Sequence, residues 1–263
     1  MYILGLRVFA TISFGLLTAG IFALTPLLWS LIRNAPTSIY PLPFVLGWLV
    51  AVARVPDART SWWAVAGGLL GAGVYTSYAA TVMMPVYLVL TLAVALRTRG
   101  VRSRQLVVFV AAFLAAAGPF AIFLVRDPSR FRAAVMGYHL YDANRFNVLQ
   151  GVREMTSWLG LTARSEVYYD YFNPAFLFLG GRVLLLPLLV LIPVGVYFIV
   201  VYESSLVARV SLAGFLAAPF AAALTADPPV PGRIRFITPF AAILAAYGLK
   251  HLFSRRRSTL DIS

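Results

Sequence analysis

The uncharged stretches of this chain limit its possible folds more than any other feature. From Gln105 to Val125 the sequence contains no Asp, Glu, Lys or Arg. A transmembrane helix needs about 20 consecutive, mostly apolar residues, and this stretch has that length. The rest of the chain repeats the pattern, since 61% of its residues are hydrophobic and only 12% are charged, against about 25% charged in a typical soluble domain. The sequence therefore predicts a polytopic membrane protein and argues against a soluble enzyme.

Eight apolar segments are candidates for membrane spans, which predicts an all-α fold: a bundle of about eight transmembrane helices. We interpret residues 1–263 as a single transmembrane domain. Two of the segments, Ile39–Val52 and Val82–Leu96, are shorter than a full span and are either extended, tilted or partly re-entrant. The predicted spans are Val8–Ile32, Ile39–Val52, Trp62–Tyr78, Val82–Leu96, Gln105–Val125, Val183–Tyr202, Val210–Thr225 and Phe236–Phe253.

The positive charge of the chain has two readings, nucleic-acid binding or membrane topology. The formal net charge is +13. With eight spans, the short basic loops fall on one side of the membrane, which the positive-inside rule assigns to the cytoplasm. We therefore expect no nucleic-acid partner. The basic residues on this side are Arg7, Arg54, Arg59, Arg97, Arg99, Arg102, Arg104, Arg209 and Arg255 to Arg257.

A long polar segment from Arg126 to Arg182 separates the fifth and sixth predicted spans, so we expect it on the outer face. It holds five of the nine acidic residues: Asp127, Asp142, Glu154, Glu166 and Asp170. Apolar residues recur within it at helical spacing, which favours short amphipathic helices lying on the membrane surface. These apolar positions are Val148, Val152, Met155, Leu159 and Leu161.

Three arginines on the predicted outer side, Arg33, Arg233 and Arg235, lie at the ends of spans. The planar fork of donors on a guanidinium suits a phosphate group, although an arginine at such a position also reaches ordinary lipid headgroups.

The chain contains no cysteine, which excludes thiolate metal sites and disulfides. We predict no metal site from the residue pattern, and any requirement for a divalent metal stays open.

Four segments, taken in order, are similar to one enzyme family. They are the glycine-rich Trp63–Ala80 with its Tyr-Thr-Ser-Tyr turn, the segment from Asp127 to Arg132, the aromatic segment Tyr171–Gly181, and Pro229–Arg235 with the span that follows. On these segments the chain resembles the GT-C-type polytopic glycosyltransferases that use polyprenyl-phosphate sugars. The nearest likeness is the bacterial branch related to protein mannosyltransferases and aminoarabinose transferases.

The resemblance implies transfer of a sugar from a polyprenyl-phosphate donor to a glycan, lipid or protein acceptor on the outer face of the cell inner (plasma) membrane. It implies that Arg33, Arg233 and Arg235 bind the donor phosphate. The segment from Arg126 to Arg182 would then hold the acceptor. The acceptor residues implied are Arg132, His139, Asp142 and Asn173.

The chain also departs from the family pattern. Family members carry one or two acidic residues in a first outer loop, and no segment of this chain matches that loop, so we expect the catalytic carboxylate to be absent and the chain to be N-terminally shortened. Thr81 stands where the family often has arginine, and Gly180–Arg182 replaces a Gly-Asp pair.

Because of these departures, a non-catalytic membrane subunit or remnant is an alternative function. A transporter of lipid-linked or small solutes is another, disfavoured because the predicted spans contain almost no charge.

Overall fold

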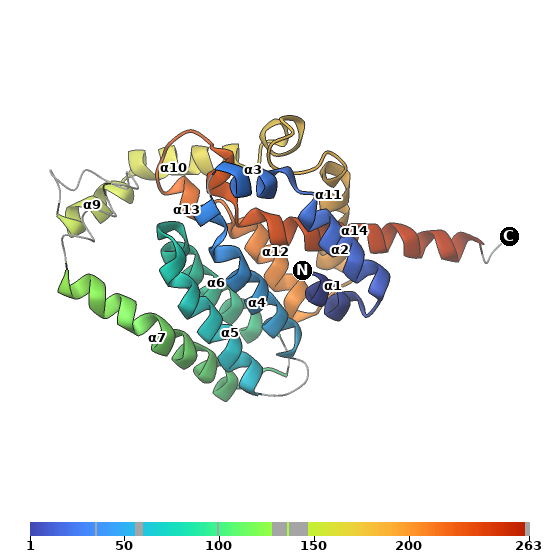
Figure 1. Cartoon of the computed structure of the whole chain (residues 1–263), viewed down its shortest axis with the longest axis horizontal. Coiled ribbons are helices and arrows are strands. Elements are labelled where there is room, and N and C mark those ends of the chain that lie inside the picture. Colours follow the sequence, from blue (N-terminus) through green and yellow to red (C-terminus); the bar gives the residue numbers. More distant parts are fainter. Residues whose placement is uncertain (35, 56–59, 99, 128–135, 137–146, 261–263) are drawn as a thin grey trace.

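The computed structural model describes residues 1–34, 36–55, 60–98, 100–127, 136 and 147–260 (Figure 1). These residues form helices and no strands. The all-α fold is therefore confirmed for the described part of the chain, and the core is one continuous cluster of buried side chains drawn from helices along its length.

The first predicted span is wrong as a single helix. Residues 8–32 are divided among α1 (Tyr2–Phe9), α2 (Ile12–Ala23) and α3 (Pro26–Asn34). The chain turns first at Ala10, whose φ of 55° is left-handed. It bends again by 50° between α2 and α3, where Pro26 opens the new helix because proline lacks the N–H that would continue the old one.

Within the described part of the chain, three helical segments are long and apolar enough to cross a membrane, or four if the bent pair α2 and α3 counts as one. They are α6 (Tyr78–Leu96), α7 (Ser103–Arg126) and the joined pair α12 (Leu206–Ala217) and α13 (Phe220–Ala223). The chain is thus a membrane protein by the length and composition of its helices. Helix α6 begins four residues before the predicted Val82 and so reaches a full span.

Three of the other predicted spans, at α4, α11 and the first part of α14, correspond to apolar helices of 10–17 residues. Helix α4 covers Pro41–Ala53, and α5 covers Thr60–Gly73 before a short 3-10 turn, η3 (Val74–Thr76). Helix α11 covers Leu188–Val201, and α14 covers Ile237–Leu260, of which Ile237–Phe253 is the apolar part. The count of eight spans stays a prediction.

Glycines allow two pairs of helices to pack closely. On α5, Gly67 lies against the backbone carbonyl of Phe109, and Gly71 against that of Phe113, both on α7. A second glycine pair lies between α11 and α14. Gly195 on α11 meets the carbonyl of Leu244, and Gly248 on α14 meets that of Leu191. Such backbone contacts replace the side-chain interdigitation of soluble helix pairs.

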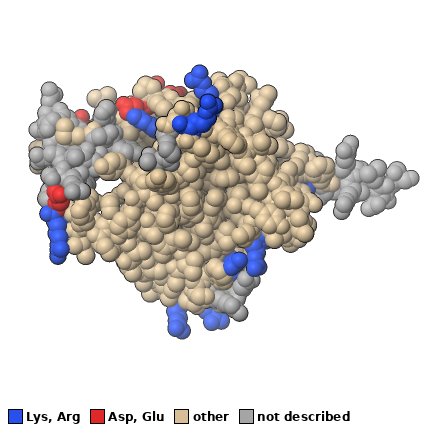
Figure 2. All heavy atoms as spheres, in the orientation of Figure 1, with Lys and Arg blue, Asp and Glu red and all other residues tan. Residues whose placement is uncertain are grey.

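The segment from Arg126 to Arg182 contains two further α-helices, α9 (Val148–Met155) and α10 (Trp158–Asp170), and a π-helical turn, η4 (Ala175–Leu179). The predicted helical stripe is therefore divided between two helices. In Figure 1, α9, α10, α3 and α13 gather at one end of the bundle, opposite the end at which α5 begins. Figure 2 shows the charged side chains concentrated toward the two ends, with a wide uncharged band between them.

Candidate functional site

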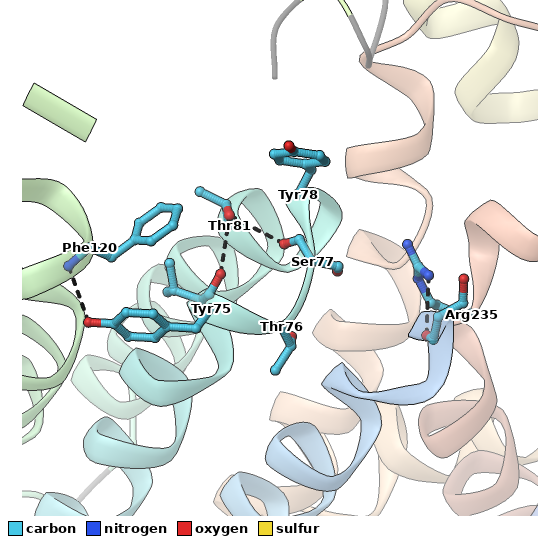
Figure 3. Close-up of a pocket in the computed structure, with 9 residues that line it drawn as sticks. Tyr75, Thr76, Ser77, Tyr78, Thr81, Phe120 and Arg235 are labelled. Carbon is cyan, nitrogen blue, oxygen red and sulfur yellow. Dashed lines mark hydrogen bonds between the residues drawn. The ribbon is translucent and has the colours of Figure 1, made fainter. Parts of the chain in front are cut away.

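A pocket of about 440 Å³ lies at the end of the bundle that carries α10 and α13. One wall is the connection from α5 to α6, and the opposite wall carries Arg235 (Figure 3). Helix α7 contributes Phe120, and the 3-10 turn η1 (Pro36–Ile39) contributes Ser38. The lining residues are Ser38, Val74, Tyr75, Thr76, Ser77, Tyr78, Thr81, Phe120 and Arg235.

The first wall exists because the sequence stops one helix and starts another within four residues. The Thr76 hydroxyl donates to the Gly73 carbonyl at 2.7 Å, which closes the end of α5. Ser77 is extended, with φ −168° and ψ 161°, and its hydroxyl accepts from the Ala80 N–H at 3.2 Å as the N-cap of α6. The Thr81 hydroxyl donates back to the Val74 carbonyl at 3.2 Å. Hydroxyl side chains thus fix the turn.

This turn places the N-terminus of the 19-residue helix α6 at the pocket. The first turn of a helix presents backbone N–H groups without intrahelical acceptors, and the helix dipole puts partial positive charge there. A helix start of this kind is suited to a phosphate or another anion.

Tyr75 joins this wall to helix α7. Its hydroxyl donates to the Ala116 carbonyl at 2.9 Å and accepts from the Phe120 N–H at 3.1 Å. The Ala116 carbonyl and the Phe120 N–H are four residues apart, which is the spacing of a hydrogen bond within an α-helix. They flank Pro119, which lacks an N–H and so weakens the backbone ladder of α7 at this point. The Tyr75 and Phe120 rings also pack edge-on at 5.4 Å.

Arg235 provides a cation on the opposite wall. Its side chain is 7% exposed, and its Nη1 donates to the Ser38 carbonyl at 3.2 Å. The guanidinium carbon lies 5.8 Å from the centre of the Phe236 ring. Arg235 thus faces the start of α6 across the pocket, and a guanidinium and a helix N-terminus both favour an anionic group. One of the three arginines predicted to bind phosphate therefore lines the pocket.

The other two predicted arginines lie elsewhere. Nη1 of Arg233 donates to Thr225 Oγ1 and to Asp227 Oδ2, both at 2.8 Å. Arg233 therefore closes the loop between α13 and η5 (Pro231–Ile234) and is not among the pocket residues. Arg33 is exposed in the last turn of α3 and also does not line the pocket.

The four predicted acceptor residues are not brought together within the described part of the chain. Asn173 is exposed, and its Oδ1 accepts from the Ala175 N–H at 2.9 Å, where it fixes the start of η4. The remaining three, Arg132, His139 and Asp142, lie outside the described residues.

Tyr171 connects two of the segments on which the family resemblance was based. It is fully buried, and its hydroxyl accepts from the Val230 N–H at 3.3 Å. Burial raises the pKa of this phenol, while the hydrogen bond from Val230 and the charge of Arg233 oppose the rise. Tyr171 thus contacts the loop that leads to Arg235, and Tyr75–Tyr78 faces Arg235 across the pocket.

Sequence reasoning did not identify Ser38, Tyr75, Ser77, Thr81 or Phe120 as site residues. A usable signal existed for Ser77, because a serine between an apolar glycine-rich segment and a second apolar segment is a typical N-cap. No signal existed for Ser38, which takes part through a backbone carbonyl.

Comparison with protein families, with curated proteins and with solved structures gave no match for this chain.

Proposed function

We propose that this chain is a membrane glycosyltransferase of the GT-C type, or the C-terminal portion of one, that takes a sugar from a polyprenyl-phosphate donor. One observation carries the proposal: Arg235 and the N-terminus of α6 face each other across one pocket. Both features favour a phosphate, and both belong to segments on which the sequence resemblance rests.

In the proposed complex, the donor phosphate lies between the first turn of α6 and the Arg235 guanidinium. The Ser77 and Thr81 hydroxyls border the same space, although both already hold the turn through hydrogen bonds. Tyr75 and Phe120 give the pocket an aromatic side toward α7, which suits the apolar chain of a lipid-linked donor better than a free nucleotide. Membrane lipid surrounds the remainder of the bundle.

The proposed topology has about eight spans in the cell inner (plasma) membrane, with the segment 126–182 on the outer face as the acceptor loop. The short apolar helices of α4, α11 and α14 then cross where the bilayer is locally thinned or where flanking side chains reach to the interface. The acceptor is a glycan, a lipid or a protein on that face.

A second function is a binding subunit without catalysis. The observation in its favour is that none of the described residues lining the pocket is acidic. The described carboxylate nearest in sequence to Arg235 is Asp227, which is paired with Arg233 at 2.8 Å. A glycosyl transfer of this class needs a base for the acceptor hydroxyl, so a chain with this pocket alone would hold the lipid phosphate without transferring the sugar.

The test is binding of a polyprenyl phosphate and transfer of its sugar, each measured on the purified chain in lipid nanodiscs. We expect Arg235→Ala to lower the affinity by at least about tenfold, which corresponds to ~1.4 kcal/mol, and Arg235→Lys to recover part of the loss. Arg104→Ala is the matched control, since Arg104 is exposed at the start of α7. Unchanged affinity in a folded Arg235→Ala variant would refute the site, whereas normal binding without transfer by the wild-type chain would select the second function.

A further inference from the structure

Helices α9 and α10 expose large apolar side chains at the end of the bundle. Leu149 and Val152 on α9 are 82% and 51% exposed. Trp158 and Leu159, in the first turn of α10, are 83% and 81% exposed. Large apolar side chains exposed on two neighbouring helices are costly in water and usually mark a contact surface. We call Leu149, Val152, Trp158 and Leu159 the exposed apolar surface.

This surface belongs to an ordered corner between the two helices. Helix α9 begins with a reciprocal cap, in which Asn147 Oδ1 accepts from the Gln150 N–H at 2.9 Å and Gln150 Oε1 accepts from the Asn147 N–H at 3.1 Å. Ser157 Oγ donates to the Glu154 carbonyl at 2.7 Å and accepts from the Gly160 N–H at 3.1 Å. Gly160 lies so close to the end of α9 that an added Cβ would be 2.8 Å from the Met155 carbonyl.

The second half of α10 and the residues just after it bind this corner to the rest of the bundle. Nε of Arg164 donates to the Leu224 carbonyl at 3.0 Å, and the Tyr168 hydroxyl donates to the Leu216 carbonyl at 2.6 Å. The Phe172 ring packs 5.8 Å from that of Phe215. The exposed apolar surface is therefore held at a fixed place on the bundle.

Two observations identify what covers the surface. First, Arg164 on α10 donates to the Leu224 carbonyl, directly after the candidate span α12–α13, and Figure 1 draws α9 on the side where α7 ends, so the surface lies at the level where these spans end. Second, residues 147–170 carry Arg153 and Arg164 against Glu154, Glu166 and Asp170, so the helices lack the basic face that would attract an acidic partner or anionic lipid. Apolar contact at the lipid boundary fits both observations.

We propose that α9 and the first turn of α10 lie in the interface of the membrane leaflet nearest the end of α7, with the exposed apolar surface inserted among the lipid chains. The insertion depends on hydrocarbon contact, and it is independent of anionic headgroups. The proposal does not depend on any transferase activity or on what binds the pocket.

The absence of cysteine from the chain permits a direct test with single-cysteine variants of the full chain in liposomes. A nitroxide spin label is attached at Val152→Cys or Leu159→Cys, and its collisions with oxygen, which concentrates in lipid, are compared with those of a water-soluble nickel chelate. Glu154→Cys is the matched control, because Glu154 is exposed on the same helix but away from the Leu149–Val152 side. Leu149→Cys repeats the measurement at a third position.

We expect labels at positions 149, 152 and 159 to favour oxygen over the nickel chelate by several-fold, and the label at 154 to show the reverse. Vesicles of phosphatidylcholine alone and vesicles containing phosphatidylglycerol should give the same values. Equal access of the nickel chelate to positions 152, 154 and 159 would overturn the proposal. Protection of 152 and 159 from both reagents would also overturn it, because a second copy or another protein would then cover the surface.

Discussion

The wall of the pocket and the exposed apolar surface use side chains in opposite ways. At the pocket, polar groups are turned inward: the Tyr75 hydroxyl reaches the backbone of α7, and Arg235 is almost fully buried. On α9 and α10, apolar groups such as Trp158 and Leu159 are turned outward. In a soluble protein the inward polar groups would be tolerated because they are hydrogen-bonded, whereas the outward apolar groups would be unfavourable in water. Together they are what a protein in a bilayer requires, since its polar groups must be satisfied internally and its apolar groups have lipid to contact.

The comparison predicts that the packing of α5 on α7, which supports the pocket wall, is sensitive to small changes and that the exposed apolar surface is not. The largest effect is expected at Gly67, where an added methyl group would meet the Phe109 carbonyl of α7. We expect Gly67→Ala to destabilise the protein by about 1–3 kcal/mol through overpacking, measured as the thermal unfolding midpoint in detergent.

Gly68 provides the matched control for Gly67, because a Cβ added there meets no atom within 4 Å. Gly68→Ala should leave stability unchanged or raise it by about 0.5–1 kcal/mol, since alanine favours the helix. Equal effects of the two substitutions would mean that α5 and α7 do not pack through Gly67.

A smaller effect is expected from the Tyr75 hydroxyl. Tyr75→Phe keeps the ring contact with Phe120 and removes the two hydrogen bonds to α7, at a cost of about 1–2 kcal/mol in stability. Tyr169→Phe, at an exposed position with the same ring chemistry, should change stability by less than about 0.5 kcal/mol. Chemical denaturation in detergent compares the two, and a Tyr75→Phe variant as stable as Tyr169→Phe would refute the bridging role.

Tyr171 should make stability depend on pH. Because burial raises its pKa, folding favours the protonated phenol, so its contribution is complete below the unfolded pKa of about 10 and is lost as the pH rises through the folded value. Tyr171→Phe should cost about 1 kcal/mol at pH 8 and reduce the further loss of stability above pH 10. Unfolding midpoints at pH 8 and pH 11 measure this, and an unchanged pH dependence would contradict it.

The smallest effect is expected on the exposed apolar surface itself. Leu149→Ser should change unfolding in detergent by less than about 0.5 kcal/mol, since Leu149 is exposed and its removal opens no cavity. A loss of stability comparable to that of Gly67→Ala would show that α9 is covered by another part of the chain. It would contradict the stated difference between the two regions.

The sequence predicted the apolar helices well and their interruptions poorly. Hydropathy alone located α7, because an uncharged stretch of span length has few other folds available. It placed the start of α6 too late, since Ser77 acts through a capping hydrogen bond that hydropathy does not register. It also merged α1, α2 and α3, where the left-handed Ala10 depends on backbone geometry and not on composition.

For the site, the residue type was predictable and the choice among residues was not. Arg233 and Arg235 are two positions apart and have the same chemistry. Tertiary contacts separate them: Thr225 and Asp227 engage Arg233, and the Ser38 carbonyl accepts from Arg235 on the pocket wall. Ser38 precedes Arg235 by 197 residues in the chain, so no local pattern could indicate that they meet.

The central claim is that the pocket between α6 and Arg235 recognises a phosphate carried by a lipid. The most direct measurement is native mass spectrometry of the intact chain with equal concentrations of a polyprenyl phosphate and the corresponding neutral polyprenol. We predict at least about tenfold preference for the phosphate in the wild-type chain, equivalent to ~1.4 kcal/mol, and loss of that preference in Arg235→Ala. Equal binding of the two lipids by the wild-type chain, or an undiminished preference in Arg235→Ala, would contradict the claim.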